Sequence, residues 1–254
     1  MKIASIQLNI CWENKSANFK RARFFVKQAK KDHCDLIIFP EMFNTGFSMN
    51  PDITTEPVNS ETSKFLCMLA KKYKINLIAG FVERNKERDE NIALFVNKSG
   101  EIKSRYVKNY PYSYAGENKV YSCGKNPVIF DLEDHPATTF ICYDLRFPEL
   151  FRKIAKKVEI IIIIANWPVA RQMHWETLLK ARAIENQCFV VGVNRIGKDG
   201  NNLEYGGASH VYSPLGQDLS KGDIDQEYIL TEINLREVSK IRKTLPFLND
   251  MKDF

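Results

Sequence analysis

Three residues that can do covalent chemistry each follow a stretch that is expected to form a β-strand. Cys142 follows "TTFI", Glu41 follows "DLIIFP" and Lys108 follows "SRYV". Open α/β sheets place their chemistry at the carboxyl ends of the strands, where the connecting loops diverge. A thiol, a carboxylate and an ammonium group at three strand ends therefore indicate one shared reaction site.

A cysteine with a carboxylate and a lysine can hydrolyse an amide without histidine. Glu41 would take the thiol proton of Cys142, and the thiolate would attack the substrate carbonyl. The Lys108 ammonium and the backbone N–H of Tyr143 would receive the charge that develops on oxygen. Ammonia would leave, and water activated by Glu41 would then release the acid from the thioester.

Taken singly, these residues also have ordinary structural explanations. Cys142 could be a small buried residue that ends a strand, Glu41 a surface acid and Lys108 an edge lysine. Cys142 could also pair with His174, as in papain-like enzymes, but Glu41 and Lys108 would then have no role. Pro148 suits the first turn of a helix just beyond the cysteine, and a nearby helix N-terminus favours a thiolate.

The hydrophobic pattern predicts strands and helices that alternate along the chain. The run "IIIIIA" at 160–165 shows no alternation, which is typical of a central strand covered on both faces. No boundary rich in Gly, Pro or Ser divides the chain, so we expect one α/β domain over residues 1–254. Strands are expected at 2–9, 35–40, 75–84, in hairpins within 79–107, and at 128–143, 158–166, 188–194, 207–213 and 227–234; helices are expected at 19–29, 60–73, from Pro148, at 171–187 and from Arg236.

The composition favours a cytoplasmic protein without metal or cofactor. The N-terminal segment resembles a first strand more than a signal peptide, and the longest apolar run is about a third of a membrane span. Six cysteines lack paired spacing, and four histidines are too dispersed for a local metal cluster. The net charge of +6 is explained by solvated helix faces such as "KRARFFVKQAKK", with nucleic-acid binding as the rival.

The stretches "FPEMF", "YVKNY" and "CYDLRFPELF" resemble the three signatures of the nitrilase, or carbon–nitrogen hydrolase, superfamily. The resemblance implies that Glu41, Lys108 and Cys142 form the catalytic set. It also implies that Glu117, in "GENKVYSCG", is a second glutamate that orients the lysine and the substrate; an exposed loop acid is the alternative. The Cys-Tyr-Asp context is similar to the amidase and carbamoylase branches, which argues against nitriles as substrates.

The segments "ANWPVARQMHWETLLKARAIENQCFVVGVNRIGKDGN" and "YGGASHVYSPLGQ" resemble the ω-amidase group of this superfamily. The resemblance implies a four-layer αββα sandwich that forms a homodimer. It also implies hydrolysis of the terminal amide of 2-oxoglutaramate or 2-oxosuccinamate. The loop 109–112 reads Asn-Tyr-Pro-Tyr where the family commonly has His-Leu-Phe after the lysine, so the substrate is less firmly indicated than the reaction.

Four further residues are candidates for substrate binding. Arg146 aligns with an arginine that binds the substrate carboxylate in related carbamoylases, although a structural ion pair is an equal alternative. Asn166, Trp167 and Arg171 follow the strand at 160–165 and are expected to form pocket walls. Rival functions are hydrolysis of N-carbamoyl amino acids and, outside enzymes, a non-catalytic binding protein on the same fold.

Overall fold

Two β-sheets lie face to face in the computed structural model, which describes residues 1–86, 88–220 and 226–252. The first sheet has the order β14-β1-β2-β4-β5-β6, with β3 beside β4, and the second has the order β13-β10-β9-β8-β7. The first consists of β14 (Tyr228–Glu232), β1 (Lys2–Ile6), β2 (Leu36–Ile38), β4 (Asn76–Asn85), β5 (Arg88–Val96), β6 (Ile102–Val107) and β3 (Thr55–Pro57). The second consists of β13 (His210–Tyr212), β10 (Phe189–Asn194), β9 (Ile160–Ala165), β8 (His135–Ile141) and β7 (Ile129–Leu132).

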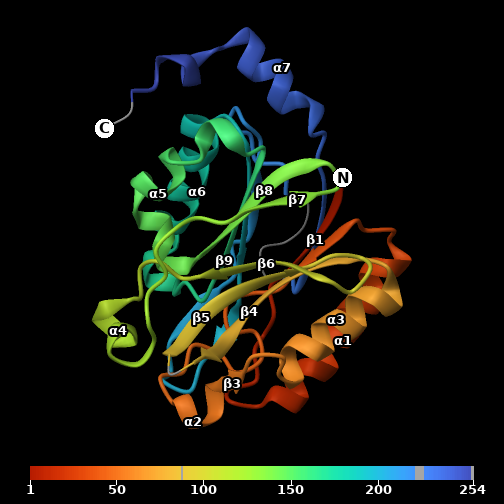
Figure 1. Ribbon diagram of the computed structural model, residues 1–254, viewed down its shortest axis with the longest axis vertical. Helices are drawn as coiled ribbons and strands as arrows, with labels where there is room; N and C mark the ends of the chain where they lie inside the picture. The colour runs from red at the N-terminus through yellow and green to blue at the C-terminus, as the bar shows by residue number, and fades with distance from the viewer. Residues whose placement is uncertain (87, 221–225, 253–254) are drawn as a thin grey trace.

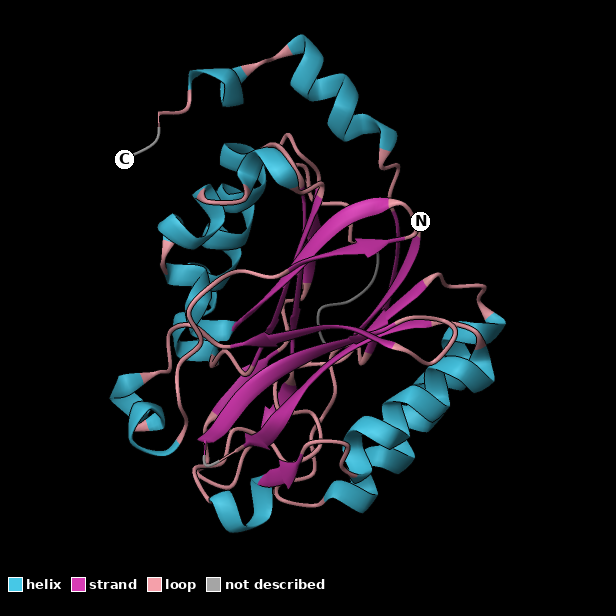
Figure 2. Ribbon diagram, in the orientation of Figure 1, coloured by secondary structure: helices cyan, strands magenta, loops and turns pink. Residues whose placement is uncertain are grey.

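Helices cover the outer face of each sheet, which gives four layers (Figures 1 and 2). Helices α1 (Lys15–Lys31) and α3 (Glu61–Tyr73) lie on the first sheet, and α5 (Pro148–Arg152) and α6 (Gln172–Asn186) lie on the second. The predicted αββα sandwich is therefore confirmed. Helices α2 (Pro51–Thr54), α4 (Glu117–Val120) and α7 (Arg236–Thr244) lie outside these layers.

Side-chain alternation in the first strands separates two apolar layers. Ile3 and Ile38 belong to the apolar cluster that includes the second sheet, whereas Ala4 and Ile37 belong to the cluster under α1 and α3. Successive strand residues point to opposite faces, so one short strand serves both layers. β9 contributes five isoleucines to the cluster that includes the second sheet, and this cluster also contains Trp175 and Leu179 of α6 on the outer face. The prediction that this strand is covered on both faces is confirmed.

The antiparallel hairpins predicted within 79–107 are present as β4-β5-β6. The predicted strand 207–213 is wrong at its start, because Gly207 and Ala208 adopt φ of +66° and +52°, outside extended geometry. The chain there forms β13 only from His210, and the residues before it form β12 (Glu204–Gly206), which pairs with β11 (Ile196–Lys198). The prediction that residues 1–254 form one domain stays a prediction.

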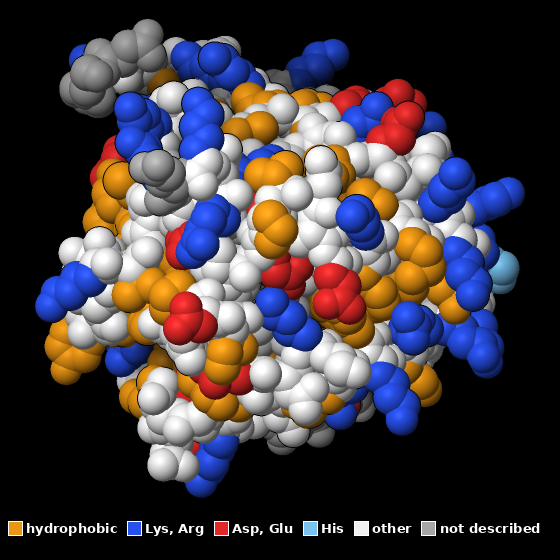
Figure 3. Space-filling view, turned by 60° about the horizontal axis from the view of Figure 1, so that its bottom comes forward, with side chains coloured by type: hydrophobic (Ala, Val, Ile, Leu, Met, Phe, Trp, Pro, Cys, Tyr) orange, Lys and Arg blue, Asp and Glu red, His pale blue; other side chains and the backbone are white. Residues whose placement is uncertain are grey.

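Lysine and arginine side chains gather on the right of Figure 3, on the side where α1 and α3 lie in Figure 1. Lys20, Lys27 and Lys30 are exposed on α1, whereas Phe19, Ala22 and Val26 of the same helix are buried. This arrangement agrees with solvated helix faces. Among the described residues, no helix is long and apolar enough to cross a bilayer.

Gly80 allows β4 to approach the segment that follows β2. A Cβ atom at this position would lie 2.8 Å from Glu41 Cα and 2.8 Å from Ile164 Cδ1. We expect Gly80→Ala to lower the free energy of unfolding by about 1–3 kcal/mol, because the backbone at Glu41 cannot move aside as a flexible side chain would. Urea unfolding checks this, and an unchanged midpoint and slope would contradict the close approach.

Candidate active site

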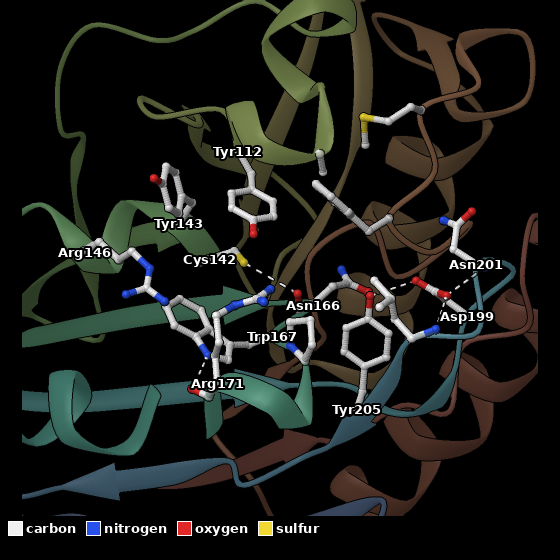
Figure 4. A pocket seen from close by; sticks show the side chains of 15 residues that line it. Tyr112, Cys142, Tyr143, Arg146, Asn166, Trp167, Arg171, Asp199, Asn201 and Tyr205 are labelled. Atoms are coloured by element: carbon white, nitrogen blue, oxygen red, sulfur yellow. Dashed lines mark hydrogen bonds between the residues drawn. The ribbon is translucent and has the colours of Figure 1, made fainter. Parts of the chain in front are cut away.

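Cys142 lies at a sharp turn where β8 ends. It begins the 3-10 helix Cys142–Arg146 and has φ of +47°, a left-handed conformation that is uncommon for a residue with a side chain. The turn places the thiol in a pocket, where its Sγ atom lies 3.7 Å from the carbonyl oxygen of Asn166 (Figure 4). Strained backbone of this kind persists only where the surrounding structure holds it.

Glu41 follows β2 after Phe39 and Pro40 and has no exposed surface. Its Oε1 atom accepts hydrogen bonds from Lys108 Nζ at 2.8 Å and from Asn91 Nδ2 at 2.8 Å. Its Oε2 atom accepts the backbone N–H of Asn166 at 2.9 Å. The peptide groups of Asn166 thus contact both the carboxylate, through N–H, and the thiol, through C=O.

Lys108 follows β6 and is also fully buried. Its ammonium lies 2.8 Å from Glu41 Oε1 and 2.8 Å from Glu117 Oε2. Burial by itself lowers the pKa of Lys108, but the Glu117 and Glu41 carboxylates outweigh it and hold this pKa well above its ordinary value. Lys108 therefore stays charged, and Glu117 is a buried partner of the lysine and not an exposed loop acid.

The pKa of the Cys142 thiol is raised well above its ordinary value. Burial is the largest cause and the Glu41 carboxylate adds to it, while the Lys108 ammonium acts in the opposite direction. The thiol is therefore protonated at neutral pH, despite the nearby helix start. A reaction through Cys142 needs a base that takes the proton as the new bond forms.

Asn91 links the two glutamates and was missed by the sequence analysis. Its Nδ2 donates to Glu41 Oε1 at 2.8 Å and to Glu117 Oε1 at 2.9 Å. Asn91 lies in β5 and is 1% exposed. The signal was a polar side chain beside the apolar stretch "IALFV", because an amide buried in a strand requires partners of its own.

Asp144 fixes the loop of Cys142 to the segment that carries Lys108. It is fully buried and accepts hydrogen bonds from Tyr106 Oη at 2.7 Å, Tyr110 N at 2.8 Å and Ile141 N at 3.0 Å. Burial raises the pKa of Asp144 to about 7, against the opposite effect of these donors and of Lys108. This side chain contacts both strand ends at once, which sequence spacing could not reveal.

The pocket in front of Cys142 is small, about 110 Å³. Arg146, Asn166, Trp167 and Arg171, the predicted substrate-binding residues, all lie on its wall, and Tyr143 lines it as well. The side-chain amide of Asn194, at the end of β10, accepts a hydrogen bond from the backbone N–H of Trp167 at 2.7 Å and donates one to the backbone carbonyl of Trp167 at 2.9 Å. These two bonds hold Trp167 in place. The remaining lining residues are Phe47, Met49, Tyr112, Ala115, Pro168, Asp199, Asn201, Leu203 and Tyr205.

His174 is exposed on α6, and its Nδ1 atom lies 3.2 Å from Arg146 Nη2. The Cys142 thiol donates to the carbonyl oxygen of Asn166, so the structure does not support a Cys142–His174 pair. The next residue, Trp175, is buried, and its indole N–H donates to Ala208 O at 2.7 Å. Over the described ranges, no three His, Cys, Asp or Glu side chains are placed to hold a metal ion.

The fold and the site together define an αββα protein with a pocket cysteine and, connected to it through Asn166, a buried cluster of one lysine and two glutamates. The chain belongs to the carbon–nitrogen hydrolase family, whose sequence profile matches residues 2–243. The predicted superfamily and enzyme class, a hydrolase of carbon–nitrogen bonds, are thereby confirmed.

Two relatives and one solved structure show how far the similarity extends. The chain is 33% identical over 253 residues to the 2-oxoglutaramate amidase of Bacillus subtilis (strain 168), over 98% of this chain and 97% of that protein. It is 33% identical over 258 residues to the omega-amidase YafV of Escherichia coli (strain K12), over 100% and 98% of the two chains. A CN-hydrolase superfamily protein from Xanthomonas campestris, which carries an arsenic adduct in its active site, superposes with a TM-score of 0.94 at 29% identity, over 100% of this chain and 98% of that one.

The raised pKa of Cys142 predicts slow alkylation by iodoacetamide at pH 7 that accelerates as the pH rises, because only the thiolate reacts. The pH midpoint should lie above that of glutathione in the same solution. Site-resolved mass spectrometry of the Cys142 peptide gives the rate at each pH.

Glu41→Gln is the matched variant, since it removes the carboxylate charge that raises the pKa of Cys142 and keeps nearly the same shape. Its alkylation midpoint should shift to lower pH. A wild-type midpoint at or below that of glutathione, or no shift in the variant, would contradict the electrostatic interpretation.

Proposed function

We propose that the protein hydrolyses the terminal amide of small dicarboxylic acid ω-amides, such as 2-oxoglutaramate or 2-oxosuccinamate, to the acid and ammonia. The observation that carries this proposal is the placement of Cys142 on the pocket wall, where Asn166 contacts both its thiol and Glu41 of the buried Glu41–Lys108 pair. The names of two relatives, a 2-oxoglutaramate amidase and an omega-amidase, support the substrate class.

In the first half-reaction, Glu41 removes the thiol proton of Cys142 as sulfur attacks the amide carbon. This order follows from the raised pKa of the thiol, which leaves little thiolate before substrate arrives. The charge on the carbonyl oxygen is stabilised by the Lys108 ammonium and the backbone N–H of Tyr143. Glu41 returns the proton to nitrogen, the carbon–nitrogen bond breaks, and ammonia leaves a thioester.

In the second half-reaction, Glu41 takes a proton from water, and the hydroxide attacks the thioester carbon. The carbon–sulfur bond breaks, the acid is released and the proton returns to sulfur. Lys108 stays charged throughout because Glu117 remains its partner when Glu41 is protonated. Glu117 therefore acts by holding the lysine, and no step needs a metal or a cofactor.

Arginine side chains on the pocket wall fit the carboxylate at the far end of such substrates. Arg146 lies with its guanidinium 4.8 Å from the Trp167 ring centroid, and Arg171 lies 5.7 Å from that of Tyr112. The acid on this wall, Asp199, already accepts hydrogen bonds from Tyr205 Oη and from two backbone N–H groups. A guanidinium binds a carboxylate through two parallel hydrogen bonds. We therefore assign Arg146 and Arg171 to binding the substrate carboxylate, and Asn166 and Trp167 to the pocket wall beside it.

We also propose that the protein is a cytoplasmic homodimer, as its resemblance to the ω-amidase group suggests. Support for a dimer comes from exposed apolar side chains around α6, where Met173 is 72%, Ile184 48% and Leu215 60% exposed. Met173→Asp should shift the mass in sedimentation equilibrium from twice the 29.4 kDa chain toward one chain. A wild-type monomer at micromolar concentration would contradict the dimer.

Ammonia release from a panel of amides tests the reaction. We expect turnover of 2-oxoglutaramate and 2-oxosuccinamate, slower turnover of butyramide, and a loss of at least about 10³-fold in Cys142→Ala with an unchanged thermal midpoint. Mass spectrometry after acid quenching should find an acyl group on Cys142 of the wild type.

Three outcomes would contradict this proposal. Carbon dioxide released with ammonia from N-carbamoyl amino acids, at a higher rate than from ω-amides, would favour a carbamoylase. Ammonia from none of the amides would favour a binding protein. Full activity in Cys142→Ala would exclude the thiol as nucleophile.

A further inference from the structure

Tyr112 connects the buried charges to the pocket wall. Its backbone N–H donates to Glu117 Oε2, and its carbonyl oxygen accepts the backbone N–H of Glu117 at 3.2 Å. It also precedes the 3-10 helix Ser113–Ala115, whose last residue donates its N–H to the Tyr112 carbonyl at 3.1 Å. The position of Tyr112 is therefore fixed by the glutamate that holds Lys108.

The Tyr112 ring lies close to two other side chains that line the pocket. The centroid of the Tyr112 ring lies 4.9 Å from that of the Tyr143 ring and 5.7 Å from the Arg171 guanidinium, and all three side chains line the pocket. Figure 4 shows the phenol oxygen directed into the pocket, toward Cys142 and Arg171. The hydroxyl thus faces the space between the thiol and the Arg171 guanidinium, to which we assigned the substrate carboxylate.

The Tyr112 hydroxyl has no hydrogen-bond partner among the residues that the structure describes. A ligand that fills the pocket removes water from this group, and a polar group left without a partner costs about 1–3 kcal/mol. A ligand with an acceptor oxygen at this point avoids that penalty, whereas a plain aliphatic amide does not. Sites built in this way discriminate strongly against ligands that lack the polar group.

We propose that Tyr112 determines specificity: its hydroxyl donates a hydrogen bond to the carboxylate or 2-oxo oxygen of the substrate end that Arg171 binds. This inference rests on the proposed function and deepens it, because it names the chemical feature that selects a substrate among small amides. The phenol and the guanidinium contact the same anionic end, and a charged acceptor strengthens the phenol hydrogen bond. Tyr112 acts in binding and leaves the bond-breaking steps to Cys142 and Glu41.

Tyr112→Phe tests the hydroxyl alone, because the ring and both backbone hydrogen bonds remain. We expect KM for 2-oxoglutaramate to rise about tenfold and KM for butyramide to fall, because the variant has no hydroxyl to leave without a partner, with kcat for both amides within about twofold. Tyr114→Phe is the matched control, since Tyr114 is on the same loop but 89% exposed, and it should behave as wild type.

A binding measurement separates this inference from the reaction itself. In a Cys142→Ala background, titration calorimetry with 2-oxoglutarate should show about tenfold weaker binding when Tyr112→Phe is added. Equal affinity with and without the hydroxyl would overturn the inference, even if the enzyme hydrolyses ω-amides. A loss of kcat on both amides would also overturn it, by placing the hydroxyl at the reacting carbonyl. A wild type inert on every amide would refute the proposed function and leave the calorimetry to decide on Tyr112.

Discussion

The structure depends on one buried charge cluster, in which the Lys108 ammonium lies between the carboxylates of Glu41 and Glu117. None of these three side chains has exposed surface. Charges removed from water are tolerated only when close partners of opposite charge and hydrogen bonds replace the lost hydration. Asn91 supplies donors to both carboxylates, and the backbone of Asn166 and Tyr112 supplies more. The hydrogen bonds that these buried charges require therefore hold the surrounding loops in position.

The same cluster sets the state of the nucleophile. Burial and the negative charge of Glu41 keep the Cys142 thiol protonated, and Lys108 counteracts this only in part. A thiol in this state is unreactive until a carbonyl is positioned beside it and a base accepts its proton. The electrostatics of the cluster thus link the reactivity of Cys142 to the presence of substrate in the pocket.

The pocket wall comes from segments that neither sheet could provide alone. Tyr112 follows the end of the first sheet, whereas Trp167 and Arg171 follow β9 of the second. Gly80, in β4, lies against both the Glu41 backbone and Ile164 of β9, so the packing of the two sheets affects where the Glu41 carboxylate lies. Packing in the centre of the sandwich is consequently connected to the geometry of the site.

The amino-acid sequence by itself determined the alternation of helices and strands and the burial of both faces of β9, because apolar periodicity reports which faces are buried; the four-layer sandwich was implied by the resemblance to the nitrilase superfamily. It also determined Glu41, Lys108 and Cys142 as candidates, because strand ends gather at one edge of a sheet. It did not determine Asn91, Asp144 or the orientation of Tyr112. Asn91 and Asp144 contact partners from 26 to 50 and from 3 to 38 residues away, and such contacts leave no periodic signal. The protonated state of Cys142 was likewise decided only by tertiary structure, since burial and the distances between charges set a pKa, and both exist only once the two sheets have packed together.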